Sequence, residues 1–152
     1  MPKPRATGRY LLPSGQSQAY YLERVMEALG AAGAKEAAVN SVPGYPLNVS
    51  RLMFTDHKTG ASKIEKRGRA AYLLYLAETL LSPDEAWLRE GDFGNRTLTL
   101  LGRYARRGEI ASTVAVFKED GALWEGWSGY QSQSEAYIQS LRAGTLVHRR
   151  HP

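Results

Sequence analysis

The stretch RTLTLLGR, residues 96–103, decides the fold, because its apolar side chains recur at every second position. Leucines there alternate with threonines, which is the period of a β-strand with one buried face. Two further strands are predicted, one over residues 110–117, which are rich in valine and threonine, and one over residues 123–128 after a Glu-Asp-Gly turn. Short connections join the three strands, so we expect them to be antiparallel.

Residues 1–44 are predicted to form a flexible lead-in and an N-terminal helical extension. Residues 1–16 contain prolines and glycines and have no periodic apolar pattern. Apolar residues on one helical face predict a helix over residues 17–30. A Val-Pro-Gly turn signal before Tyr45 separates this part from a main domain over residues 45–152.

Two capping signals predict the helices of the main domain. A serine and a glutamate at the ends of residues 62–65 have the spacing of a capping box, which predicts a helix to about residue 81. Gly68 within it costs about 1 kcal/mol relative to alanine, which suggests close backbone approach or a frayed first turn. A second such signal at residues 82–85 predicts a short helix through Trp87.

The C-terminal part is predicted to hold one more helix and one more strand. A capping box at residues 132–135 would open a helix that runs to Arg142 and ends at Gly144, and residues 145–149 predict a short strand. Helices followed by a small, mostly antiparallel sheet of three to four strands indicate the α+β class.

Composition restricts the classes of function. The chain has 152 residues, of which 43% are hydrophobic, and this suits one compact domain with a modest extension. It has no cysteine, which excludes disulfides, thiolate metal sites and a cysteine nucleophile, and three histidines argue against a histidine-rich metal site. No apolar run approaches the roughly 20 residues of a membrane span, and no signal peptide is visible, so we expect a soluble, intracellular protein.

The balance of charge favours an anionic partner. The formal net charge is +5, and 14 of the 20 cationic side chains are arginines, whose planar fork matches phosphate oxygens. A basic surface that only maintains solubility is the alternative, and charge alone does not distinguish the two.

The basic segment, residues 63–69, is the strongest local candidate for phosphate binding. If it opens a helix, its free amide groups and the positive dipole end would face an anion. The alternative is a solvated first turn, but cations are electrostatically unfavourable there, which favours a functional role. Lys66 and Arg69 would share a face, and Arg67 would point elsewhere, toward a nucleic-acid backbone.

Several short motifs occur together over residues 46–150. They are, in chain order, Pro46-Leu47-Asn48-Val49-Ser50 before Leu52-Met53-Phe54, Lys66-Arg67-Gly68-Arg69 with Tyr72-Leu73, Pro83-Asp84-Glu85-Ala86-Trp87, Arg103-Tyr104, Trp127-Ser128, and Tyr137-Ile138 followed by Leu141-Arg142-Ala143-Gly144. In this order they resemble the phage-encoded nucleases grouped with barnase, EndoU, the colicin-type tRNA nucleases and RelE, which are often fused behind phage head-morphogenesis proteins of the Mu gpF type.

The resemblance implies a barnase/RelE-like fold and a toxin-like RNA endonuclease that cleaves by attack of the ribose 2′-hydroxyl, with no metal and no cofactor. Such chemistry requires a base, an acid and cations that stabilise the transition state. RNA, including tRNA, is then the expected substrate. An immunity or inhibitor protein and phage head proteins are further expected partners, no membrane is involved, and the expected location is the bacterial cytoplasm or the phage particle.

Five residues are candidates for catalysis: Lys66, Arg69, Arg103, Ser128 and Arg142. Arg103 lies on the strand face opposite the leucines, so it is expected to face an open side where a substrate can lie. Relatives place a threonine where Ser128 stands, and Arg142 matches the family's arginine before Ala-Gly. The structural alternatives are an ordinary strand-end serine and a cation that interacts with the helix dipole.

Six further residues are expected to contact nucleic acid: Arg67, Tyr104, Trp127, Tyr137, His148 and Arg149. Trp124 and Trp127 should point to opposite faces of their strand, so at least one should belong to the core and the other could stack on a base. His148 is a candidate general acid, and His57, in the loop before the basic segment, is a similar candidate. A surface role is the alternative for both histidines.

No obvious base of the barnase kind stands out, so Tyr104 or Tyr137, which lie near arginines, is the expected base. An enzyme should gather the catalytic candidates around a phosphate-sized gap, whereas a binding protein can carry them on separate surfaces. The main alternative function is therefore a non-catalytic nucleic-acid-binding or phage-particle protein. A DNA-cleaving or metal-using nuclease fits less well.

Overall fold

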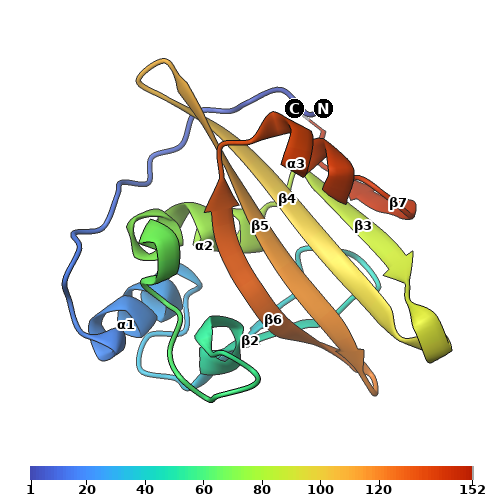
Figure 1. The fold of residues 1–152 in the computed structure, drawn as a ribbon, viewed down its shortest axis with the longest axis horizontal. Coiled ribbons are helices and arrows are strands. Elements are labelled where there is room, and N and C mark those ends of the chain that lie inside the picture. Colours follow the sequence, from blue (N-terminus) through green and yellow to red (C-terminus); the bar gives the residue numbers. More distant parts are fainter. Residues whose placement is uncertain (152) are drawn as a thin grey trace.

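The computed structural model of the chain describes residues 1–151, except for the side chain of residue 92. A mixed sheet in the order β1-β2-β6-β5-β4-β3-β7 forms its centre (Figure 1). All neighbouring strands are antiparallel except β2 and β6. The strands are β1 (Glu36–Val39), β2 (Leu47–Ser50), β3 (Glu85–Glu90), β4 (Arg96–Arg106), β5 (Glu109–Asp120), β6 (Leu123–Ser132) and β7 (Thr145–Arg149).

The helices are α1 (Gln18–Ala28), α2 (Leu73–Leu81) and α3 (Glu135–Leu141), with the short 3-10 segments η1 (Arg51–Phe54), η2 (Lys66–Tyr72) and η3 (Asp92–Gly94). The α+β class is confirmed. The predicted sheet of three to four strands was too small, because seven strands pair in one sheet. Among the described residues, no helix has the length and apolarity needed to cross a bilayer.

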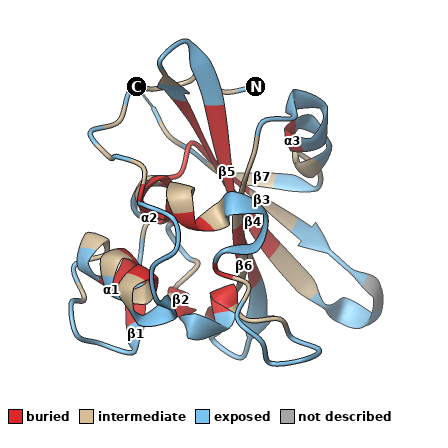
Figure 2. Cartoon of the chain, turned by 60° about the vertical axis from the view of Figure 1, so that its left-hand side comes forward, coloured by how far each residue is buried: buried red, intermediate tan, exposed pale blue. Residues whose placement is uncertain are grey.

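The two faces of the sheet carry different helices. α1 and α2 cover one face, where Leu98 and Leu100 pack into the main core, and α3 lies on the other, where Ile138 packs on Leu101 and Val114 (Figure 2). The leucine face of β4 packs into the main core, as the alternation predicted, but the opposite face is buried as well, because Thr99, Leu101 and Arg103 are at most 5% exposed. The α3 face is the one that carries the candidate site.

The strand β3 replaces the short helix predicted after Ser82. Its sequence follows a serine and a proline that resemble a helix start, yet β3 pairs along its length with β4 and at the sheet edge with β7. Asp84 and Glu85 are buried there at 3% and 1% exposure, and arginines from distant parts of the chain contact both. Pairing with strands far away in sequence outweighs the local helical signal.

The basic segment does not open a helix. Arg67 and Gly68 have φ values of 54° and 73°, in the left-handed region, and α2 begins only at Leu73. The predicted capping box fails because Glu65 is used elsewhere: its carboxylate accepts hydrogen bonds from the Tyr21 hydroxyl and the Gly15 amide, both at 3.1 Å. Gly68 thus occupies a position that favours glycine, which explains its presence.

The start of α3 also differs from the prediction. Ser134 is its N-cap, because the serine oxygen accepts a hydrogen bond from the Tyr137 amide at 3.2 Å. Ser132 instead belongs to β6 and accepts a hydrogen bond from the Ser134 amide. The body of α3, the helix α1 and the strand β7 all occur where the sequence predicted them.

The segment before residue 45 contributes to the same core as the later elements. Leu12, Tyr21 and Val25 are buried, and β1 pairs with β2 at one edge of the sheet. Arg5 forms a parallel bridge with Tyr104 of β4. A division of the chain at residue 45 stays a prediction.

Candidate functional site

The basic segment lies beside β6 and α3. Cζ of Arg69 is 5.3 Å from the centroid of the Tyr130 ring, and the hydroxyls of Tyr130 and Tyr137 are 2.6 Å apart. Lys63 lies close enough to Arg69 and Lys66 for their charges to lower the pKa of its ammonium. We call these five residues the tyrosine site. It joins side chains from η2, β6, α3 and the loop before η2.

Arg69 forms no ion pair with a carboxylate among the residues that the structure describes. Burial lowers the pKa of its guanidinium, the Tyr130 and Tyr137 hydroxyls act in the opposite direction, and the charge of Arg67 lowers it further. Its Nη1 atom is buried and has no hydrogen-bond partner within residues 1–151. Buried donors are nearly always paired, so this unpaired nitrogen is a candidate donor to a phosphate oxygen of a ligand.

Lys63 shares this positive environment. Burial and the Arg69 charge lower the pKa of its ammonium, Asp56 raises it, and Lys66 lowers it again. The result is an ammonium that gives up its proton more readily than an exposed lysine. Lys66 itself is exposed, as is Arg67.

The two tyrosines of the site differ in their surroundings. Burial raises the pKa of Tyr130, the hydrogen bond and charge of Tyr137 raise it further, and Arg69 lowers it only in part. Tyr130 therefore keeps its proton and is the natural donor in the pair, with the Tyr137 oxygen as acceptor. Tyr137 is 42% exposed, so its oxygen can be reached from solvent.

A second feature of β6 lies next to the tyrosine site. The strand has an irregularity at Trp127, since Gly126 and Ser128 pair with consecutive residues of β5. The Trp127 indole stacks on the His57 imidazole with centroids 3.6 Å apart, and the Lys118 ammonium is 4.1 Å from the ring centroid. One face of the indole is therefore already covered by a ring of the protein.

The stacked histidine has a defined tautomer when it is neutral. His57 Nε2 lies 2.9 Å from the Trp127 carbonyl oxygen, which can only accept a hydrogen bond, so Nε2 carries the hydrogen. The lone pair is then on Nδ1. Trp124, by contrast, is 4% exposed and packs in the core, which agrees with the prediction that at least one tryptophan of the strand is buried.

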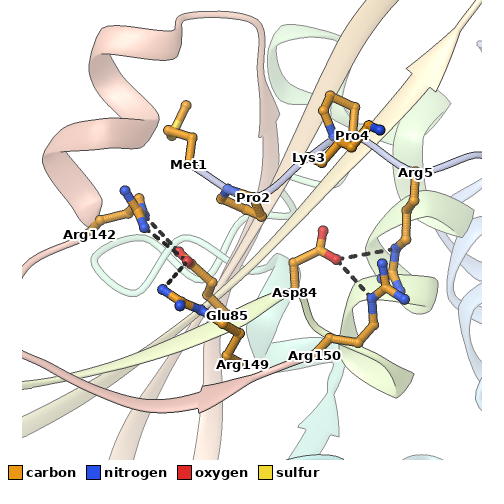
Figure 3. A pocket seen from close by; sticks show the side chains of 10 residues that line it. All are labelled: Met1, Pro2, Lys3, Pro4, Arg5, Asp84, Glu85, Arg142, Arg149 and Arg150. Carbon is orange, nitrogen blue, oxygen red and sulfur yellow. Dashed lines mark hydrogen bonds and ion pairs between the residues drawn. The ribbon is translucent and has the colours of Figure 1, made fainter. Parts of the chain in front are cut away.

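Glu85 organises a separate group on β3 (Figure 3). Arg142 donates to both of its oxygens, at 2.7 and 3.0 Å, the Trp87 indole N–H donates at 3.0 Å, and Arg149 is 3.5 Å away. Burial acts to raise the pKa of Glu85, but these bonds and charges outweigh it and the pKa is lowered. Arg142 is thus engaged by a buried carboxylate instead of facing open solvent.

Arg103 does not face an open side, contrary to the prediction. The leucine face of β4 does meet the helices, but α3 and the first residues of the chain cover the other face at this point. Arg103 is 5% exposed and donates to the Pro2 carbonyl at 2.6 Å and to Glu135 at 2.5 Å. The alternation correctly placed Arg103 on the face of β4 opposite Leu98 and Leu100. Segments distant in sequence, α3 and the first residues of the chain, cover that face.

Tyr104 is also corrected, because it lies in the core at 0% exposure. Its hydroxyl contacts Thr79 at 2.7 Å and Arg5 at 3.2 Å. Burial raises the pKa of Tyr104, and the opposing effects of Thr79 and Arg5 do not cancel this. It neither presents a surface for nucleic acid nor provides a base that ionises easily in this structure.

The predicted site residues therefore fall in two places. Lys66, Arg67, Arg69 and Tyr137 lie at or beside the tyrosine site, with Trp127 and Ser128 on the same strand as Tyr130. Arg103, Arg142, His148 and Arg149 lie over β4, β3 and β7. Three strand spacings separate β6 from β3, which is about 14 Å.

Sequence reasoning missed Tyr130, and it included Lys63 only as part of the basic segment, not as a site residue of its own. A signal for Tyr130 existed, because residues 128 and 130 of one strand share a face and Ser128 was already a candidate. Nothing in the local sequence indicated that Lys63 is partly buried. Among the side chains that the structure describes, no three acidic or histidine residues lie close enough together to hold a metal ion.

Comparison with known proteins identifies the family. No curated protein and no solved structure matches the chain. A scan against protein-family models matches residues 24–149 to the family described as phage-Barnase-EndoU-ColicinE5/D-RelE like nuclease2. The match spans most of the chain and includes both groups of residues described above, so the chain belongs to this family of phage nucleases.

Proposed function

We propose that the chain is an RNA endonuclease that cleaves by attack of the ribose 2′-hydroxyl on the adjacent phosphate, without a metal ion. Membership of a nuclease family supports cleavage of nucleic acid. The observation that carries the proposal is the unpartnered, buried Nη1 of Arg69 beside the hydroxyl pair of Tyr130 and Tyr137. A phosphate bound there would meet cations and proton-transfer groups together.

In this mechanism Arg69, with Lys63 and Lys66, stabilises the negative charge that develops on the phosphate. The 2′ oxygen bonds to phosphorus while the bond from phosphorus to the 5′ oxygen breaks. The exposed Tyr137 oxygen, which lies 2.6 Å from the Tyr130 hydroxyl, acts as the general base and takes the 2′ proton. The Lys63 ammonium gives a proton to the leaving 5′ oxygen. The products are a 2′,3′-cyclic phosphate and a free 5′-hydroxyl.

Incubation of the purified protein with bacterial RNA in EDTA tests the proposal. We expect cleavage to 2′,3′-cyclic phosphate ends, with a loss of about 100-fold or more in Arg69→Ala and Tyr137→Phe. Tyr10→Phe and Arg51→Ala, which change exposed residues elsewhere, should keep full activity. Melting curves of each variant separate loss of activity from loss of folding.

Two results would contradict the proposal. Cleavage that requires an added metal would refute the metal-free route while leaving a nuclease. No cleavage under any metal condition would refute the enzyme and leave the second candidate, a non-catalytic protein that binds nucleic acid or belongs to a phage particle. That candidate is favoured by the engagement of Arg103 and Arg142 in ion pairs away from the tyrosine site.

The biological setting is part of the same proposal. We propose RNA, including tRNA, as the substrate and toxin-like action in the bacterial cytoplasm or after carriage in a phage particle. An immunity or inhibitor protein and phage head proteins are the proposed partners. The phage context of the family supports this setting.

A further inference from the structure

A half-open hollow of about 600 Å³ lies on the other side of α3 from the tyrosine site, between residues 1–5, the start of β3 and the end of β7. Figure 3 shows two ion-pair groups beneath the first residues of the chain. One is centred on Glu85, and the other on Asp84. We call this space the arginine hollow. The charged residues that line it are Lys3, Arg5, Asp84, Glu85, Arg142, Arg149 and Arg150.

Both carboxylates of the hollow are already satisfied by the protein. Asp84 accepts from Arg150 Nε at 3.0 Å and from the Arg103 amide at 2.8 Å, and Arg5 Nε lies 3.6 Å away. Glu85 accepts from Arg142 and from the Trp87 indole. They have little capacity left for a further cation, so the hollow is not a metal site.

The cations, however, exceed what the carboxylates can neutralise. Four arginines and Lys3 face two carboxylates, which leaves a surplus of three positive charges. Some of the guanidinium donors are used elsewhere, because Arg5 donates to Ser82 and Tyr104 and Arg142 donates to Gln139. With five N–H donors on each guanidinium, the four arginines still carry more donors than the two carboxylates accept. Arg5 Nε is buried with no hydrogen-bond partner within residues 1–151, and the Arg149 side chain is 56% exposed.

We propose that the arginine hollow binds a phosphate group. Arginine forks match phosphate oxygens in pairs, and several arginines held in place by buried carboxylates lose little freedom when an anion binds. The volume is within the range of small-ligand pockets, so a phosphate on a nucleotide or on an RNA strand would fit. This inference does not rest on RNA cleavage at the tyrosine site, because it concerns binding alone.

Inorganic pyrophosphate is a suitable probe. Titration of the purified protein, followed by calorimetry and by NMR of the arginine side-chain N–H groups, should show saturable binding at the hollow. Arg149→Ala should weaken that binding about fivefold or more, through loss of a charge-assisted hydrogen bond. Lys3→Ala should also weaken it. Both changes affect exposed side chains, so the fold should persist, which melting curves would verify.

Lys35→Ala is the matched control, because it removes one charge from an exposed lysine next to β1, at the edge of the sheet opposite to β7. Pyrophosphate affinity should be unchanged in this variant. Equal losses in Lys35→Ala and Arg149→Ala would overturn the proposal, since they would report only the net charge of the protein. Absence of saturable binding would overturn it as well.

A 2′-O-methylated oligonucleotide, which lacks the attacking hydroxyl, identifies the source of the phosphate. If its affinity falls in Arg149→Ala but not in Lys35→Ala, the hollow takes a phosphate of the nucleic-acid strand. If only pyrophosphate binding falls, the hollow takes a free phosphate or a small phosphate ester. Either result supports the phosphate site, and neither depends on whether the protein cleaves RNA.

Discussion

At the scale of single residues, the pairing of Tyr130 with Tyr137 gives two similar side chains different roles. Tyr130 is partly buried and its pKa is raised, whereas Tyr137 reaches solvent. Arg69 lies over the Tyr130 ring and has a buried donor without a partner in the described part of the chain. A phosphate bound at Arg69 would accept the hydrogen bond of its unpaired Nη1 atom.

A titration of Tyr130 tests this picture. Its phenol should ionise well above the ordinary tyrosine pKa of about 10, because burial and Tyr137 both disfavour the phenolate. In Tyr137→Phe the pKa of Tyr130 should fall toward the ordinary value. NMR of ring-labelled tyrosine across alkaline pH measures both effects.

Tyr10→Phe serves as the control for the titration, because Tyr10 is 63% exposed. It should leave the ionisation of Tyr130 unchanged. If Tyr130 in the unmodified protein ionises at or below the ordinary tyrosine pKa, the assignment of Tyr130 as the protonated partner is wrong.

The sequence identified part of the tyrosine site. Lys66 and Arg69 stood out through charge, and Tyr137 through the family motif. Lys63 belonged to the same basic segment but was not singled out, because its partial burial depends on the fold. Tyr130 was missed because its role comes from its contacts with Arg69 and Tyr137. Arg103 and Tyr104 were assigned to a surface that residues 1–5 and the helices in fact cover.

At the scale of elements, the ion pair of Arg142 with Glu85 fastens the end of α3 to β3. Arg142→Ala should lower the free energy of unfolding by about 2 kcal/mol, because it leaves the Glu85 carboxylate buried with fewer partners. Urea denaturation measures the change. The double variant Arg142→Ala with Glu85→Gln should recover part of the loss, since the uncompensated charge is then absent.

Arg89→Ala is the matched control for this prediction, because Arg89 is an exposed arginine of the same strand. It should change stability by less than about 0.5 kcal/mol. An equal stability of Arg142→Ala and the unmodified protein would show that the ion pair does not fasten α3.

Local sequence patterns predicted an element correctly where the apolar face of the pattern is also the face that packs in the core. α1 has a serine cap and one apolar face, β4 alternates leucine with threonine, and β5 is rich in β-branched residues. The helix predicted to end near residue 81 is present as α2, but its predicted start at residue 62, like the helix predicted from residue 82, rested on a capping signal and is wrong. Glu65 and Glu85, the acidic residues of those signals, instead bind groups far away in sequence.

At the scale of the whole molecule, the free energy of unfolding should fall at low pH, in part because Glu85 becomes protonated. The pKa of Glu85 is lower in the folded protein than in the unfolded chain, where it is about 4.3. The ionised Glu85 therefore stabilises the fold above the unfolded pKa, and this stabilisation is lost as pH falls through the folded pKa. Urea denaturation from about pH 7 to about pH 3 should show a loss of stability that is smaller in Glu85→Gln.

Glu23→Gln, which alters an acidic side chain that is 65% exposed, is the control and should follow the unmodified protein. If Glu85→Gln and the unmodified protein lose stability equally in acid, Glu85 does not carry the proposed ionic contribution.

By itself, the sequence determined the α+β class, the three central strands and β7, the helices α1 and α3 and the main part of α2, the surplus of arginine and the family resemblance. These depend on local periodicity, local capping, composition and the order of motifs, all of which can be found along the chain without knowing which distant residues meet. Only the tertiary structure decided that β1 and β3 extend the sheet and that the arginines form two separate groups. The reason is physical: strand pairing and burial of charge depend on residues that are distant along the chain and adjacent only after folding.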